Sequence, residues 1–346
     1  MKNKYLIRMA ISMVGAVILF VFVVNNSWMY KSPVAKVLAV HNNGNKQSIE
    51  LRLENGSDKG KTVYVKNKYD KSQVYDERYF KYDYVFLNDE YTGITGIKRD
   101  YWVAAIFLFL LSSLITIGGK RGTYTSLCIL GNIALFGIII YMNMRGVDIL
   151  YMTIAGTVVF TFFVLLVVDG LSHRMMLSFA AALLTTLLLS SLVMLLIWHT
   201  DIDYDFLHFL PEPFTTTDAN HFFLAQIIIG CLGAVIDVSV TITAACMELI
   251  ERTPSISNKS LLRSVREVAD DINGTMISVV LLTNIASTLP IFLISMSNEI
   301  SFRTVVSHDA YFYIVRSLTG MLSIVVAILV STFITSLVAR KELKHD

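Results

Sequence analysis

The sequence predicts an all-α polytopic membrane bundle of about eight transmembrane helices, with a small extracytoplasmic β-barrel-like domain inserted between helices 1 and 2. Two observations support this prediction. Only 16% of the 346 residues are charged and 54% are hydrophobic, whereas a soluble domain carries about 25% charge. The apolar residues also gather in blocks of roughly 18 to 28 residues, the length that crosses a hydrocarbon layer of about 30 Å.

The first block, at about 5–24, follows Lys2, Lys4 and Arg8. A secretory signal peptide has the same basic start, but this block is long and lacks a small-residue cleavage site, so we predict a retained anchor helix over residues 1–27. Residues 101–346 then form a seven-helix membrane domain. Its blocks lie at about 101–117, 124–142, 147–168, 175–198, 222–250, 275–296 and 312–339.

Lysine and arginine are unevenly divided between the short connecting segments. One side holds many of them, including Lys120, Arg174 and Arg340, while short loops on the other side hold only Arg145 and Arg303. The positive-inside rule therefore predicts a multi-pass cell-membrane protein with both termini in the cytoplasm and residues 28–100 outside.

Residues 28–100 have the pattern of a β-rich domain. Segments 34–40, 49–53 and 62–65 alternate apolar and polar residues, and 83–87 does so less regularly. Four or five short strands favour a small closed or nearly closed barrel. We interpret its many lysines as an ordinary solvated surface, in preference to a face for anionic lipid or wall polymer.

Asp237 is the main candidate functional residue because it lies near the middle of block 222–250. A carboxylate at that depth costs at least ~2.5 kcal/mol on insertion scales, so function is favoured over structural pairing. Residues on the same helix face recur at three- and four-residue spacing. They are small residues for helix packing and polar residues for a substrate or ion pathway: Gly230, Gly233, Ala234, Thr241 and Glu248.

The next two helices supply further candidates. Asn284 lies at almost the same depth as Asp237 and is the preferred partner of its carboxylate. Arg316, which is also placed on the predicted pathway, is the weaker candidate for that partner because it lies nearer the outer end of its helix. Gly274 marks the cytoplasmic start of the block that contains Asn284, and Pro290 frees a backbone carbonyl in it. Before this block, Leu261, Val265, Val268 and Ile272 form the apolar stripe of an amphipathic helix, either a gate or a simple connector.

Other classes of site find little support. The acidic loop 199–221 matches calcium-ligand spacing, but Phe206 stands where a glycine is needed, which leaves only a loose divalent-cation contact open. Cys128, Cys231 and Cys246 have no metal-ligand spacing and are interpreted as small hydrophobic residues. No catalytic or nucleotide motif occurs, so we expect no enzyme and no cofactor. A net charge of +2 also argues against a nucleic-acid partner.

Several strings in the C-terminal half resemble the YibE/F-like family of bacterial multi-pass membrane proteins. They are Gly230-Cys-Leu-Gly233-Ala234-Val-Ile-Asp237, Glu248-Leu249, Gly274-Thr275-Met276 and Ile314-Val315-Arg316. The resemblance covers a core of 222–339 and, more loosely, the β-rich domain. It implies a permease without an established substrate and a paired YibE/F-like membrane subunit as partner.

Two functions from different classes remain. The first is a permease or secondary transporter subunit that handles a small ion or solute through the mid-membrane carboxylate. The alternative is a non-transporting cell-envelope scaffold or sensor whose β domain binds a partner or wall polymer. A transporter should require the Asp237 carboxylate, whereas a scaffold should tolerate asparagine at this position.

Overall fold

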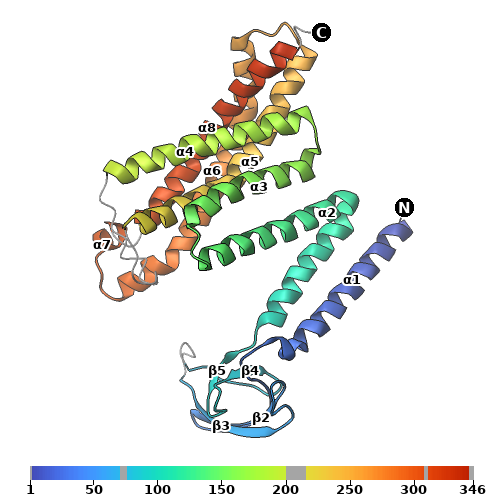
Figure 1. Ribbon diagram of the computed structural model, residues 1–346, viewed down its shortest axis with the longest axis vertical. Helices are drawn as coiled ribbons and strands as arrows, with labels where there is room; N and C mark the ends of the chain where they lie inside the picture. The colour runs from blue at the N-terminus through green and yellow to red at the C-terminus, as the bar shows by residue number, and fades with distance from the viewer. Residues whose placement is uncertain (1, 71–75, 200–215, 308–310, 343–346) are drawn as a thin grey trace. The chain divides into compact units, whose positions relative to one another are not determined.

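The computed structural model describes residues 2–70, 76–199, 216–307 and 311–342 (Figure 1). The chain divides into two compact units, 1–126 and 127–346. The first unit contains α1 (Lys2–Val24), a short 3-10 helix (Asn26–Met29), β1 (Val34–Asn43), β2 (Lys46–Leu53), β3 (Thr62–Lys68), β4 (Tyr84–Leu87), β5 (Ile94–Ile97) and the first part of α2 (Asp100–Met144). The second contains the rest of α2, α3 (Ile149–Asp169), α4 (His173–His199), α5 (Thr216–Arg252), α6 (Asn258–Ser297), α7 (Phe302–Ser307) and α8 (Tyr311–Glu342).

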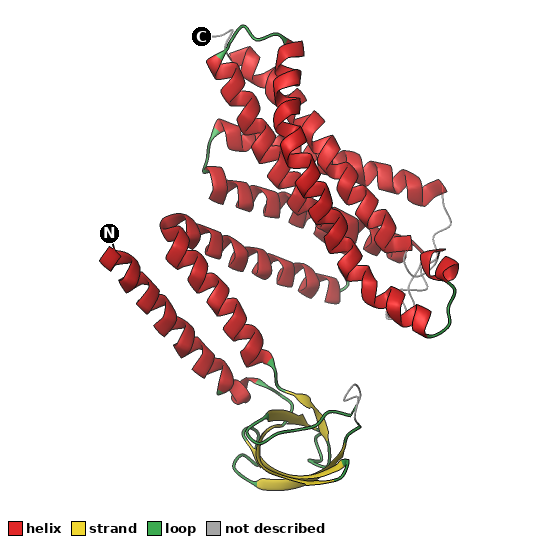
Figure 2. Ribbon diagram, turned by 180° about the vertical axis from the view of Figure 1, so that it is seen from behind, coloured by secondary structure: helices red, strands yellow, loops and turns green. Residues whose placement is uncertain are grey.

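The predicted β-rich domain is a five-stranded antiparallel sheet in the order β3-β2-β1-β4-β5. Alternate side chains of the strands, among them Val37, Leu51, Val65 and Val85, form its buried core, as half-buried strands require. The strands curl around a common centre in Figure 2. However, no ladder joins β3 to β5 among the described residues, so the structure supports a small sheet and leaves barrel closure unconfirmed.

A fully buried lysine attaches this domain to the neighbouring helices. Lys98 follows β5 directly, and its side chain is 0% exposed. Its ammonium group donates a hydrogen bond of 2.9 Å to the carbonyl oxygen of Val23, at the end of α1, and lies 2.9 Å from the Asp100 carboxylate. Three aromatic rings also lie within 5.8 Å of it: Tyr30, Tyr84 and Tyr101. Burial of this charge is tolerated because it is paired and surrounded by ring faces.

The Asp100 carboxylate connects the same junction to the segment after α1. It accepts hydrogen bonds from the Tyr30 hydroxyl at 2.7 Å and the Asn26 amide at 3.2 Å. Burial, together with this carboxylate, raises the pKa of Tyr30 to about 12, so the phenol stays neutral and remains a donor at physiological pH. We name Lys98, Asp100, Tyr30 and Asn26 the junction cluster.

Helix α2 is broken where the sequence predicted a gap between two spans. Its 45 residues contain one non-helical residue, Gly119, with φ 56° and ψ −125°. A Cβ atom at Gly122 would lie 1.8 Å from the backbone oxygen of Leu114, so only glycine fits this close approach. The predicted spans 101–117 and 124–142 therefore correspond to the parts of α2 on either side of the break.

Six described helices are long and apolar enough to cross a membrane, with α2 counted as one. The shorter apolar stretch of α1, Met13–Val24, falls below that length. The chain is thus a mostly helical protein with a membrane-compatible set of helices, and the predicted number of eight spans is not confirmed.

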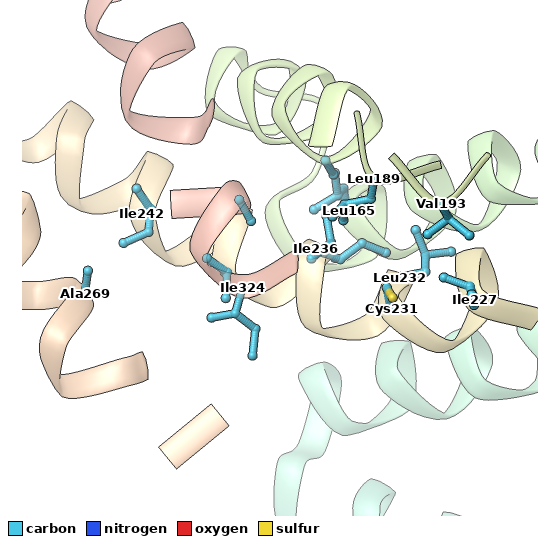
Figure 3. Packing of buried hydrophobic residues seen from close by; sticks show 14 of the residues in the cluster. Leu165, Leu189, Val193, Ile227, Cys231, Leu232, Ile236, Ile242, Ala269 and Ile324 are labelled. Carbon is cyan, nitrogen blue, oxygen red and sulfur yellow. The ribbon is translucent and has the colours of Figure 1, made fainter. Parts of the chain in front are cut away.

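Helix α5 is the centre of the second unit and packs against α3, α4, α6 and α8. Figure 3 shows the buried side chains that make this core, which come from α3, α4, α5, α6 and α8. They include Leu165, Leu189, Val193, Leu232, Ile236, Ile242, Ala269 and Ile324. Cys128, Cys231 and Cys246 are buried and unpaired, as predicted for small hydrophobic residues.

Helix α6 joins two predicted elements into one helix of 40 residues. The predicted amphipathic segment is its first part, and Leu261, Val265 and Ala269 are buried in the core of the unit. The amphipathic stripe therefore lies against the bundle, and the helix continues without interruption into the apolar block with Pro290 inside it. The predicted cation contact in the acidic loop falls mainly on 200–215, outside the described residues.

Candidate functional site

Helix α5 leaves one face uncovered by the described residues of the second unit. It is the most enclosed of the six candidate spans, because 61% of the residues in its most apolar 18-residue stretch are buried. The residues still exposed along it include Gln226, Gly230, Gly233, Asp237 and Glu248. Other spans expose large apolar side chains such as Leu282 and Leu329, as lipid contact requires. The exposed residues of α5 are instead mostly small or polar, although Ile229 is also exposed.

Asp237 is exposed on this face, and no described residue forms a hydrogen bond or ion pair with its carboxylate. Thr241 lies one turn further along, where its hydroxyl donates to the backbone oxygen of Asp237 at 2.9 Å. Glu248 forms an ion pair of 2.6 Å with Arg252, and both side chains are well exposed, so this pair contributes little stability. Asp237 is thus the one of these three residues whose side chain has no described partner, and the pathway role of the three remains a prediction.

Asn284 was predicted to bond the Asp237 carboxylate, and that prediction is wrong in this structure. Its amide oxygen accepts a hydrogen bond of 2.9 Å from the Arg316 guanidinium, and its amide nitrogen donates to the Val280 carbonyl at 2.8 Å. Equal depth in the membrane places two residues at one level but leaves open the direction in which each helix turns its side chain. Asn284 therefore joins α6 to α8.

Arg316 lies where α5, α6 and α8 meet. Its guanidinium lies 5.2 Å from the centre of the Tyr313 ring. Its aliphatic stem rests on Gly230, since a Cβ atom there would lie 3.6 Å from the Arg316 Cδ atom. Within the described part of the chain no carboxylate pairs with it, so the guanidinium and the Asp237 carboxylate are both without an opposite charge.

The predicted packing residues divide into two groups. Ala234 packs against the core of the unit, and Gly230 contacts Arg316. An added Cβ atom at Gly233 or Gly274 would meet no heavy atom of the described chain within 4 Å, and Pro290 is exposed. Packing by these last three remains a prediction.

Three residues near the site were not predicted from the sequence. Gln226 extends the exposed face of α5 by one turn before Gly230, and the same four-residue spacing could have found it. Tyr313 stacks on Arg316 from three residues earlier in α8. Gly320 is a place of close approach between α6 and α8, because a Cβ atom there would lie 3.0 Å from Val280.

Comparison with known protein families covers almost the whole chain. Residues 105–341 match the YibE/F-like protein model, and residues 28–99 match the YibE/F family N-terminal domain. The chain belongs to the YibE/F-like family. All candidate residues from Gly230 to Arg316 lie in the first of these YibE/F matches, and the β-rich domain forms the second. No curated protein and no solved structure matches the chain.

Proposed function

We propose that this YibE/F-like chain is a membrane permease or secondary transporter subunit for a small ion or solute and works through Asp237. The observation that supports the proposal is the uncovered face of α5, where an unpaired carboxylate stands among small residues. Asp237 is the 22nd of 37 residues in this helix, so about 22 Å of helix separate it from Arg252.

A carboxylate at this depth needs water, a proton or an opposite charge. Insertion scales assign it a cost of ~2.5 kcal/mol or more in the middle of a span. In a secondary transporter, a group that exchanges a proton or cation lies near the middle of the bilayer and becomes accessible from each side of the membrane in turn.

The surroundings of Asp237 suit a second membrane subunit. Gly230 and Gly233 are exposed on the same face, and small residues let another helix approach closely in a membrane. In the proposed complex, the paired YibE/F-like subunit covers this face and encloses the carboxylate. Arg316 lies against Gly230, about 10 Å along α5 from Asp237, and provides a positive charge on the same pathway.

The test is proton and ion flux into liposomes that contain the purified protein, alone and with a paired YibE/F-like subunit. Asp237→Asn should reduce flux to the level of empty liposomes, because asparagine keeps the shape but cannot take up or release a proton. Glu251→Gln is the matched control, since it removes a carboxylate from an exposed position near the end of the same helix, outside the predicted pathway residues.

Folded yield, measured by size-exclusion chromatography in mild detergent, should be unchanged in both variants. Wild-type flux in Asp237→Asn would reject the proposed role of this carboxylate.

The alternative function is a cell-envelope scaffold or sensor, and the junction cluster favours it. A buried lysine bonded to the end of α1 and paired with the start of α2 makes a stiff connection between the β domain and the helices. A scaffold of this kind should retain its cellular activity in Asp237→Asn and lose it when Lys98 is replaced.

A further inference from the structure

The outer surface of the β domain carries a concentrated group of basic side chains. Strand register places Asn43 of β1, Lys46 of β2 and Lys68 of β3 side by side. The next level on the same face holds His41, Ser48 and Lys66, again side by side. We name these six residues the basic strand patch. All six are exposed, and they line a hollow of about 490 Å³.

The charges of this patch are not balanced. Among the described residues none of the three lysines forms an ion pair, whereas other basic residues of the domain do: Arg52 with Glu54, Lys61 with Asp58 and Arg99 with Glu77. Glu50 is the nearest carboxylate along the same face of β2, and it forms no ion pair within the described chain.

The register itself makes this arrangement unfavourable in the absence of a ligand. Lys46 and Lys68 are direct cross-strand partners, and like charges at directly opposite positions destabilise an antiparallel ladder. Lysines protect strand edges from aggregation, and this explains Lys66 and Lys68 on the edge strand β3, but it does not explain Lys46 on the inner strand β2. A bound anion would offset this repulsion.

We propose that the basic strand patch binds a phosphate-bearing polymer. Each lysine ammonium has three donors, and lysine is a common phosphate ligand that acts as a point charge. Two residues along a strand span about 6.6 Å, so the patch presents two successive levels of positive charge. A chain with repeated phosphate groups can occupy both levels, whereas a single phosphate ion occupies one.

The position of the patch favours a polymer over the membrane surface. The sheet is attached to α1 and α2 through the segment after β5, and β5 is one edge strand of the sheet. The patch lies across β1, β2 and β3 at the end of the β1–β2 hairpin, whereas β1 begins at Val34, after the segment that follows α1. Trp28 and Trp102 are 68% and 60% exposed next to the helix ends, the type of residue that marks a membrane interface.

The test measures binding to the full chain in phosphatidylcholine nanodiscs, with polyphosphate as the probe. The variant is Lys46→Gln/Lys68→Gln, which removes the facing pair. The control is Lys31→Gln/Lys59→Gln, which removes the same charge from two exposed lysines that have no described partner. We expect a loss of about tenfold or more in polyphosphate affinity for the patch variant and less than about twofold for the control.

Two further measurements complete the test. Inorganic phosphate should bind more weakly than polyphosphate, because it fills one level of the patch. The thermal midpoint of the β domain in Lys46→Gln/Lys68→Gln, measured without ligand, should be unchanged or higher than in the wild type, because the repulsion between the two lysines has been removed. If this double variant does not fold, Lys66→Gln is used as the binding variant in its place.

Three results would overturn the proposal. The first is no polyphosphate binding by the wild-type chain. The second is an equal loss in the patch and control variants, which would indicate a general effect of net charge. The third is patch-dependent binding to phosphatidylglycerol vesicles without binding to polyphosphate, which would assign the patch to lipid headgroups.

Discussion

Replacement of Lys98 by methionine is expected to loosen the junction between the β domain and the helices. Methionine keeps an unbranched apolar side chain of similar length but removes the ammonium group. The change breaks an ion pair of 2.9 Å to Asp100 and leaves the Val23 carbonyl without its donor at 2.9 Å. The ammonium is also lost from among three tyrosine rings at 5.7 to 5.8 Å.

The free-energy cost of Lys98→Met follows from the burial of Lys98 and of its ion-pair partner Asp100. Breaking a buried ion pair from one side costs about 3–5 kcal/mol. Asp100 is 30% exposed and keeps its bonds to Tyr30 and Asn26, so the lower end applies. A cost of about 3 kcal/mol corresponds to a change of about a hundredfold in the opening equilibrium of the junction.

Hydrogen–deuterium exchange of the full protein in detergent measures this opening. Peptides that contain 94–102 should exchange about a hundredfold faster in Lys98→Met than in the wild type. Lys81→Met is the matched control, because Lys81 is exposed and contacts only the Tyr82 ring, and a change within about 0.5 kcal/mol is expected. Lys98→Met/Asp100→Asn should recover part of the loss, since neither charge then remains unpaired. Exchange in Lys98→Met within threefold of the wild type would refute the role of the cluster.

Three further predictions concern topology, domain independence and the break in α2. A cysteine at Asn43 should react with a membrane-impermeant thiol reagent in intact cells and one at Asn258 should not, because lysine and arginine are concentrated on the predicted cytoplasmic side. The three native cysteines are buried and should not interfere. Labelling at Asn258 would contradict the predicted orientation. Residues 28–100 alone should give a β-type circular dichroism spectrum, since the sheet has its own core, and a random-coil spectrum would contradict this. Gly122→Ala should sharply lower the folded yield. Gly137→Ala should not, because there is open space for a Cβ atom at Gly137. Equal folded yields of the two variants would show that α2 relaxes around its break to accommodate the alanine.

The elements that the sequence predicted well are those set by simple periodicity. Apolar blocks became helices because the bilayer requires a fixed length, and three alternating segments became β1, β2 and β3 within a few residues. Strand β5 was not located, because it is four residues long and contains Gly96, so it shows no alternation. The break in α2 at Gly119 falls in the gap predicted between blocks 101–117 and 124–142, next to Lys120.

The surroundings of the candidate site were beyond prediction for a physical reason. A sequence gives the depth of a residue through the rise of the helix, but helix rotation depends on packing with neighbours. Depth alone assigned Asn284 to Asp237, while the structure turns it toward Arg316. Lys98 was missed for a similar reason, because its three rings come from separate parts of the chain.

The length of α6 has a mechanical consequence. Its 40 residues extend over about 60 Å, roughly twice the thickness of the hydrocarbon layer. The part of α6 before Pro290 can act as a lever, since a tilt of about 10° within the membrane moves an end 30 Å away by about 5 Å. Leu261 and Val265 pack near that end of α6 into the same core as α5, so a tilt of α6 would shift this contact. A small rotation near Asn284 would therefore be transmitted to the far end of the helix as a displacement large enough for another protein to detect.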